Sequence, residues 1–203
     1  MTKMSKTGPL IIGLTGSIAM GKSTVAAMLV EEGIPLFDAD AEVYRLQGPK
    51  GALLPAIETA FPGTTGPEGV LRQKLGAAVF GNPDQLKILE AIVHPAVAEA
   101  RRQFLAEHDD APMVVFDIPL LFEKGGYQGV DTIIVVSAPA PVQRARALAR
   151  EGMTAEKFDH ILTLQTPDAE KCARADHVID TGTSLAETRA QVRALVKNLQ
   201  QSH

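Results

Sequence analysis

The residues best suited to chemistry begin at Gly16, where the sequence follows the spacing Gly-x-x-x-x-Gly-Lys-Ser. This is the Walker A pattern, whose glycines let successive backbone N–H groups converge on a phosphate. At this spacing Lys22 is expected to bring a positive charge to the β- and γ-phosphates of ATP, and the Ser23 hydroxyl is expected to ligate Mg²⁺. The alternative is an ordinary glycine turn followed by an exposed lysine.

The elements predicted on either side of this loop favour the nucleotide site. The apolar run 10–15 is typical of a buried parallel strand, and 22–32 has helical spacing that stops before Gly33. A strand, a glycine loop and a helix place a phosphate at the positive end of the helix. The candidate ATP-binding residues of the loop are Gly16, Ser17, Ile18, Ala19, Met20, Gly21, Lys22, Ser23 and Thr24.

Two aspartates follow the second predicted strand, 34–37, and mark a candidate acceptor site. In extended geometry Asp38 and Asp40 would point to the same side, beside the phosphate loop. A kinase needs one carboxylate there to orient the acceptor hydroxyl and take its proton, and Asp40 is our candidate for this catalytic base. The alternative for either aspartate is to cap a helix that begins near Ala41.

The rest of the chain predicts an α/β fold with a parallel sheet. From Ala41 to about Asp110 the pattern indicates helices broken by prolines, with no clear strand. Further strands are predicted over 113–116, 132–136 and 177–179, and further helices over 141–151, 154–165 and 184–199. Asp117 ends a strand, as a Walker B aspartate would.

Arg146 and Arg150 are spaced four apart, so on one helix they would share a face. Planar guanidinium groups suit a triphosphate, so one role for both arginines would be to bind ATP. The alternative is that they are solvated surface arginines.

Composition narrows the possible partners and location. The 203 residues carry a net charge of −4 and no basic run, which argues against nucleic-acid binding. Cys172 is the single cysteine, and the apolar stretches fall short of the ~20 residues of a membrane span. Residues 1–8 look like a frayed leader without the features of a signal peptide. We therefore expect a cytoplasmic protein with no membrane partner.

Beyond the loop, the order of several short motifs resembles the dephospho-coenzyme A kinase family over nearly the whole chain. The matching segments are Ile12–Ile18, Asp38–Asp40, Arg72 with Leu75, Val79–Phe80, Leu89–Pro95, Asp117–Glu123, Gln143 with Arg146 and Arg150, Gln165, Lys171 and Ala175–Asp180. The resemblance implies a P-loop kinase that uses ATP with Mg²⁺ to phosphorylate the ribose 3′-hydroxyl of dephospho-CoA.

The resemblance also implies a division of labour. Residues 1–40, 111–140 and 167–203 would form the nucleotide-binding core, 41–110 a helical substrate domain, and 141–166 a mobile lid carrying the two arginines. It implies Asp40 as the base and Lys22 as the other catalytic residue. Substrate-binding residues would be Asp38, Arg72, His94, Pro119, Leu120 and Glu123. From its own sequence, His94-Pro95 instead predicts a helix start with proline at the first helical position.

Some positions depart from the family's common form. Tyr44 stands where an arginine is usual, with Arg45 one step later, Leu71 stands where an aspartate is common, and Thr181 replaces a common asparagine. Two other functions stay open at this point. One is a P-loop kinase acting on another nucleoside, nucleotide or polyol, and the other is a regulatory nucleotide-binding module without an acceptor.

Overall fold

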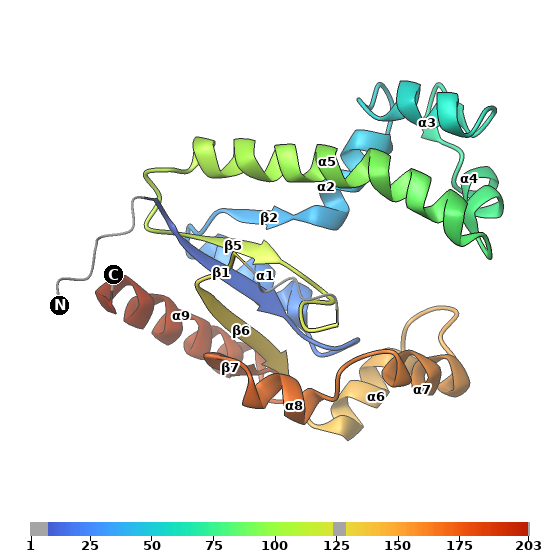
Figure 1. Cartoon of the computed structure of the whole chain (residues 1–203). Helices are drawn as coiled ribbons and strands as arrows, with labels where there is room; N and C mark the ends of the chain where they lie inside the picture. The colour runs from blue at the N-terminus through green and yellow to red at the C-terminus, as the bar shows by residue number, and fades with distance from the viewer. Residues whose placement is uncertain (1–7, 124–128, 203) are drawn as a thin grey trace. The chain divides into compact units, whose positions relative to one another are not determined.

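The computed structural model describes residues 8–123 and 129–202 (Figure 1). The leader expected at the start of the chain thus lies outside the described residues, apart from Gly8. The chain divides into two compact units, residues 1–37 with 108–203, and residues 38–107.

The first unit is built on a five-stranded sheet in the order β2-β5-β1-β6-β7. Its strands are β1 (Leu10–Thr15), β2 (Leu36–Asp38, whose last residue belongs to the second unit), β5 (Met113–Asp117), β6 (Thr132–Ser137) and β7 (His177–Asp180). The pairings of β1 with β5, β1 with β6 and β6 with β7 are parallel. Each of these strands was predicted from its apolar run, and the β1 bounds match the prediction.

One face of this sheet is covered by α1 (Lys22–Glu31) and α9 (Leu185–Ser202). The main core joins the inward residues of the strands, such as Ile12 and Leu14, to Leu29 of α1 and Val192 of α9. Along β6 the alternate residue Val135 points the other way and packs in a smaller core with Leu121 and Phe122. The inner strands β5, β1 and β6 are therefore buried on both faces, as parallel strands commonly are, whereas Val178 of the edge strand β7 is 45% exposed.

Three further helices lie between β6 and β7 in the sequence. These are α6 (Ala140–Leu148), α7 (Ala155–Thr163) and α8 (Asp168–Ala173). Ala147 of α6 and Phe158 of α7 form a small core with Ala19, which is a residue of the phosphate loop. The six-residue α8 was not predicted, because a helix this short shows too little of the 3.6-residue period.

The second unit consists of α2 (Ala39–Gln47), α3 (Leu54–Ala60), α4 (Arg72–Val79) and α5 (Pro83–Glu107). Buried Leu46, Ile57 and Leu75 form its core, against which one stripe of α5 packs. That stripe contains residues 89, 92, 93, 96 and 97, the spacing of one helix face. The expected absence of strands is wrong, because β3 (Thr65–Gly66) and β4 (Gly69–Val70) pair in a short antiparallel hairpin.

The prediction that His94-Pro95 begins a helix is also wrong, since both residues lie inside α5. The helix begins instead at Pro83, where the Asn82 side chain accepts a hydrogen bond from the N–H of Gln85. Asparagine is a better capping residue than histidine, and proline is favoured at the first helical position in both cases. Pro95 is tolerated on the exposed side of the helix.

None of the helices in the described part of the chain is long and apolar enough to cross a membrane.

The sheet core predicts a contrast between two leucine substitutions. Leu14 of β1 has no exposed surface, whereas Leu164 is 65% exposed. Leu14→Ala should lower the free energy of unfolding by about 2–5 kcal/mol, because it removes buried methyl groups and leaves a cavity. Leu164→Ala should change it by less than about 0.5 kcal/mol. Urea denaturation followed by circular dichroism measures both, and equal effects would contradict this assignment of the core.

Candidate functional site

The Walker loop runs from the end of β1 to the start of α1, and its backbone requires two glycines. A Cβ on Gly16 would lie 2.7 Å from the carbonyl oxygen of Val136, so the close approach of the loop to β6 excludes a side chain. Gly21 has φ +88° and caps α1. Ala19 also takes a left-handed φ of +61°. Alternation of this kind turns successive N–H groups toward one side, as an anion-binding loop requires.

Two glutamines from later parts of the chain hold the loop at Ile18. The N–H of Ile18 donates to Oε1 of Gln165 over 3.0 Å, and its carbonyl accepts from Nε2 of Gln143 over 2.8 Å. Both backbone groups of this residue are thus satisfied by side chains. Two further N–H groups are bonded within the segment, Met20 to the carbonyl of Ser17 over 3.1 Å and Thr24 to that of Gly21 over 3.0 Å. In the described part of the chain the N–H groups of Ala19, Gly21, Lys22 and Ser23 have no such acceptor, which leaves them for an anionic ligand.

The side chains of Ala19 and Met20 also anchor the loop to neighbouring elements. Ala19 packs against Ala147 and Phe158, and Met20 is buried with its sulfur accepting from the N–H of Ala138 over 3.2 Å. The carbonyl of Met20 accepts from the Thr181 hydroxyl over 2.6 Å. These contacts give the variable positions of the Walker pattern a structural role that the sequence did not show.

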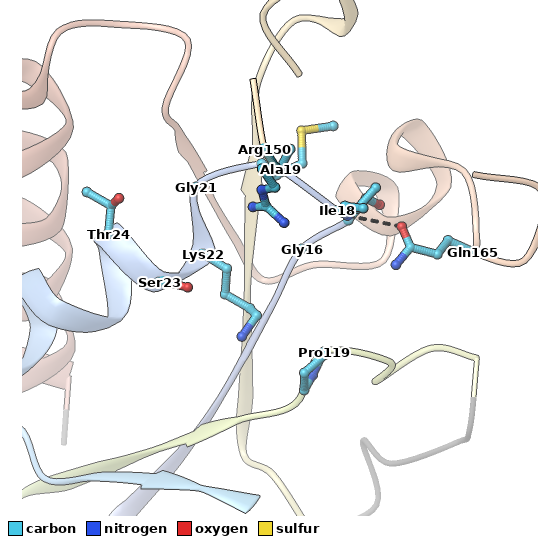
Figure 2. A pocket seen from close by; sticks show the side chains of 12 residues that line it. Gly16, Ile18, Ala19, Gly21, Lys22, Ser23, Thr24, Pro119, Arg150 and Gln165 are labelled. Atoms are coloured by element: carbon cyan, nitrogen blue, oxygen red, sulfur yellow. Dashed lines mark hydrogen bonds between the residues drawn. The ribbon is translucent and has the colours of Figure 1, made fainter. Parts of the chain in front are cut away.

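The loop encloses one side of a cavity of about 280 Å³ (Figure 2). The residues predicted to bind ATP between Gly16 and Thr24 all line it, and they are joined by Pro119, Arg150 and Gln165. Figure 2 shows Lys22 reaching into the space between the loop and Pro119. The cavity thus combines the free N–H groups with two cationic side chains, a combination suited to a polyphosphate.

Lys22 forms an ion pair with Asp117, the last residue of β5. Register places Asp117 directly beside Leu14 of the neighbouring β1, two residues before the loop begins at Gly16. Both side chains are largely buried. The structure therefore brings the Walker lysine and the predicted Walker B aspartate together at the carboxyl edge of the sheet.

A second cavity, of about 300 Å³, adjoins the first and shares Ala19, Gly21, Thr24 and Arg150 with it. Its other lining residues are Arg146, Thr181, Leu185 and Thr188. The two predicted arginines therefore face one space, although not from one helix face. Arg146 lies in the last turn of α6, which ends at Leu148, so Arg150 lies beyond the helix.

The segment after β5 carries three predicted substrate residues in different environments. Pro119 is fixed at the loop cavity, because its carbonyl accepts from the Thr15 hydroxyl over 3.3 Å. Leu120 is half-buried. Glu123 points inward, where Oε1 lies 2.8 Å from Nζ of Lys171 and accepts from the N–H of Thr166 over 2.8 Å.

The Glu123–Lys171 pair is enclosed: the lysine side chain has no exposed surface and the glutamate side chain is 13% exposed. Burial raises the pKa of Glu123, but the hydrogen bond from Lys171, the N–H of Thr166 and the lysine charge outweigh it, so the pKa lies below its usual 4.5. The Glu123 carboxyl is therefore ionised at neutral pH. Thr166 directly follows Gln165, so the pair fixes the segment that holds the Walker loop.

The remaining candidates belong to the second unit. Asp38 caps α2, with Oδ1 accepting from the N–H of Ala41 over 2.9 Å. Asp40 lies in the first turn of α2, so the expectation that both aspartates share an extended strand is wrong. Its side chain is exposed and makes no hydrogen bond or ion pair within residues 8–123 and 129–202. His94 is exposed on α5.

Tyr44 and Arg45, which depart from the common form of the family, each have a partner within the second unit. The guanidinium of Arg72 lies over the ring of Tyr44, 3.8 Å from its centroid, so the tyrosine supports the arginine as a platform. Arg45 pairs with Glu42 one turn earlier on α2. The residues that replace the family's usual arginine thus have separate partners within the second unit.

Sequence reasoning gave no role to Gln143, Gln165, Lys171 or Thr181, all of which hold the site. A usable signal exists for Gln143, which lies four residues before Ala147 on the buried stripe of α6. A glutamine in an apolar stripe needs a hydrogen-bonding partner. The other three lie in short or irregular segments, where no periodicity predicts which way a side chain points.

Known proteins are similar to this chain in sequence and in fold. A family model described as dephospho-CoA kinase matches residues 10–187. The dephospho-CoA kinase of Novosphingobium aromaticivorans is 66% identical over 197 residues, covering 97% of this chain and 98% of that protein. A crystal structure of a Thermus thermophilus protein superimposes with a TM-score of 0.80 at 35% identity, covering 95% of this chain and 98% of the other.

A third likeness concerns the fold alone. The dephospho-CoA kinase of Campylobacter jejuni has a TM-score of 0.65 at 24% identity, with 94% of this chain and 97% of that one covered.

The enclosed ion pair generates a stability prediction. Lys171→Met should lower the free energy of unfolding by about 3–5 kcal/mol, because Glu123 is left buried without a countercharge. The double variant Lys171→Met with Glu123→Leu should recover much of the loss. Lys87→Met is the matched control, since Lys87 pairs with Asp84 on the surface.

The pH dependence of the same pair has a definite sign. Because the pKa of Glu123 is lowered in the folded protein, its stabilisation is fully present above pH 4.5 and is lost as pH falls through the folded pKa. The stability difference between wild type and Glu123→Gln should therefore shrink below pH 4.5. A difference that grew on acidification would contradict the assignment.

Proposed function

The chain belongs to the dephospho-CoA kinase family, and we propose that the residues gathered around the Walker loop carry out its phosphoryl transfer. The reaction moves the γ-phosphoryl group of ATP to the ribose 3′-hydroxyl of dephospho-CoA and yields coenzyme A and ADP, the last step of coenzyme A synthesis. The observation that carries the site assignment is the cavity formed by Gly16–Thr24 with Lys22 and Arg150.

The phosphates of ATP would occupy this cavity, with the loop N–H groups around the β-phosphate. Lys22 would leave Asp117 and turn to the β/γ bridge, where negative charge develops during transfer. The ion pair with Asp117 keeps the Lys22 ammonium group at the carboxyl edge of the sheet, beside the proposed phosphate site. Catalysis in this class consists mainly of positioning and charge stabilisation, and these residues supply both.

The donor set fits Mg²⁺ brought in with the nucleotide. Ser23 offers an exposed hydroxyl in the first turn of α1, and Asp117 offers a carboxylate that could hold a metal-bound water. Within the described residues no group of three or more His, Cys, Asp or Glu side chains could hold a metal alone. This suits a cation that is held largely by substrate phosphates, where it would neutralise charge on the transferred group.

The nucleoside of ATP would lie in the second cavity, because that space shares the loop residues Ala19, Gly21 and Thr24 with the phosphate cavity. Arg150, which lines both cavities, would contact the phosphates, and Arg146 the nucleoside. We propose 141–166 as the lid that carries these arginines, and exclusion of water by this lid would favour transfer to the acceptor over hydrolysis.

We assign acceptor binding to residues 41–110, with the nucleotide-binding core formed by 1–40, 111–140 and 167–203. Arg72, supported by Tyr44, would offer its N–H groups to the acceptor's phosphates. Asp38, His94, Pro119 and Leu120 are further proposed substrate contacts. Glu123 would act on substrate only through the segments it holds, because its carboxylate faces Lys171.

Asp40 is the proposed catalytic base. Its neighbour Asp38 is occupied as the helix cap, whereas Asp40 is exposed in the first turn of α2. A carboxylate without a competing partner can accept the proton of the acceptor hydroxyl. The family resemblance supports the same assignment.

Acceptor choice tests the proposed function directly. The purified protein is incubated with ATP, Mg²⁺ and, separately, dephospho-CoA, adenosine, AMP, gluconate or shikimate, and the products are identified by mass and phosphorus NMR. We expect phosphorylation of dephospho-CoA with a kcat/KM at least about 10³-fold above that for AMP, because the remote pantetheine arm contributes binding energy to the transition state. A folded protein that binds ATP but leaves dephospho-CoA unchanged would overturn the proposal.

The two aspartates provide a matched pair for the base. Asp40→Asn keeps the side chain's shape but cannot accept the proton, so kcat should fall by ~10²–10⁴ with the Kd for ATP nearly unchanged. Asp38→Asn should cost less than about tenfold, because asparagine also caps helices. Steady-state kinetics and ATP titration measure both. A larger loss at Asp38 would reverse the assignment.

A further inference from the structure

Thr181 is a single buried residue that touches three separate parts of the ATP site. It follows β7 directly and is 5% exposed. Its hydroxyl donates to the carbonyl of Met20 in the Walker loop over 2.6 Å, and its N–H donates to the carbonyl of Ser137, the last residue of β6, over 2.9 Å. A Cβ placed on Gly21 would lie 3.1 Å from its Oγ1, so the loop packs closely against this side chain.

Thr181 also holds Arg146 through two oxygens. Nη1 of the guanidinium donates to Oγ1 over 3.1 Å, and Nη2 donates to the backbone carbonyl over 2.7 Å. A guanidinium bound at both terminal nitrogens has a fixed plane, because the group is rigid and its donors form a fork. Arg146 is thus oriented by one residue rather than left to rotate.

The Thr181 hydroxyl donates and accepts at the same time. A threonine hydroxyl has one proton and two acceptor lone pairs. Its proton faces the carbonyls of Met20 at 2.6 Å and Ser137 at 3.2 Å, and its oxygen accepts from Nη1 of Arg146. Because a guanidinium has donors only, the hydroxyl must accept in that contact, and Thr181 thereby links Arg146 to the Walker loop.

The fixed guanidinium forms part of the wall of the second cavity, which Thr181 also lines. Arginine has five N–H donors, of which two are given to Thr181. No other hydrogen bond of this guanidinium is found in the described part of the chain, so the rest of the group and its planar face remain for a ligand. Holding it in place beforehand lowers the ordering cost of binding.

We propose that Thr181 is a positioning residue for the ATP donor, which acts by holding Arg146 against the cavity assigned to the nucleoside. This inference rests on the proposed function only because it takes the second cavity to hold the nucleoside of ATP. Thr181 itself does not contact the transferred phosphoryl group. Although its hydroxyl also bonds to Met20, the loop keeps its anchors at Ile18 from Gln143 and Gln165 when that bond is lost. The effect should therefore fall mainly on recognition of the nucleoside.

The test compares Thr181→Val, which keeps the shape but removes the hydroxyl, with Thr181→Ser, which keeps the hydroxyl. Thr183→Val is the matched control, because Thr183 lies in the same segment but its hydroxyl bonds to Asp180 and Thr188. Binding of Mg-ATP and of inorganic tripolyphosphate is measured by calorimetry, and kcat and KM for ATP are measured with dephospho-CoA as acceptor.

Thr181→Val should raise the Kd and KM for ATP about tenfold, because the freed arginine side chain must then be ordered on binding, with kcat changed less than about threefold. Tripolyphosphate binding should change less than about threefold, since it has no nucleoside. Thr181→Ser and Thr183→Val should resemble wild type. In an Arg146→Ala background, Thr181→Val should add less than about threefold, because the residue it acts through is gone.

Equal weakening of ATP and tripolyphosphate binding would overturn the proposal, since it would place the defect in the Walker loop. Unchanged ATP binding in Thr181→Val, or full additivity with Arg146→Ala, would overturn it as well. If thermal melting shows that Thr181→Val does not fold, Thr181→Ala takes its place in every comparison. A wild-type protein that binds ATP but ignores dephospho-CoA would contradict the proposed function and leave this result interpretable.

Discussion

The Walker loop depends on hydrogen bonds that come from distant parts of the sequence. Ile18 has both backbone groups held by Gln143 and Gln165, and Met20 is held at its carbonyl by Thr181. Glycines permit the loop's backbone angles but do not select among the many conformations that glycine allows. These side chains select one conformation. They satisfy the backbone groups of Ile18 and the carbonyl of Met20, and they leave N–H groups at the start of α1 to a phosphate.

The segment that carries Gln165 is itself held in place by an ion pair. Gln165 can hold Ile18 only if its own segment is fixed, and the ion pair of Glu123 and Lys171 fixes the next residue through the N–H of Thr166. An enclosed pair of this kind contributes little net stability, but removing one partner is costly, so it enforces one arrangement of the segments that it joins. The segment after β5 and the one before α8 are thereby held to the same geometry, and both line the loop cavity.

The sequence predicted the parts of this architecture that strong local signals govern. The run Leu10–Thr15 and the Walker spacing located β1, the loop and the start of α1, because buried strands and glycine loops have distinctive patterns. The rule of proline at the first helical position was sound but was applied at Pro95 instead of Pro83, where Asn82 supplies the better cap. The gathering of residues 16–24 in one cavity was also predictable.

The supporting residues were not predictable in the same way. Gln165 and Thr181 bond to the loop across separations of 147 and 161 residues, and no local period encodes such a partner. Asp40 lies in a helix rather than a strand because α2 begins two residues before the predicted start, at Ala39. Boundaries of this kind are decided by packing and capping, which the apolar pattern alone does not resolve.

Those long separations bear on when the chain first becomes able to bind its nucleotide. The Walker loop leaves the ribosome early, but Gln143, Gln165 and Thr181 are synthesised more than a hundred residues later. A nascent chain that ends before Gln165 contains the whole nucleotide-binding motif yet lacks the side chains that shape it. The contacts that shape the Walker loop therefore become available only after residues 41–110, the proposed acceptor-binding part, have been synthesised.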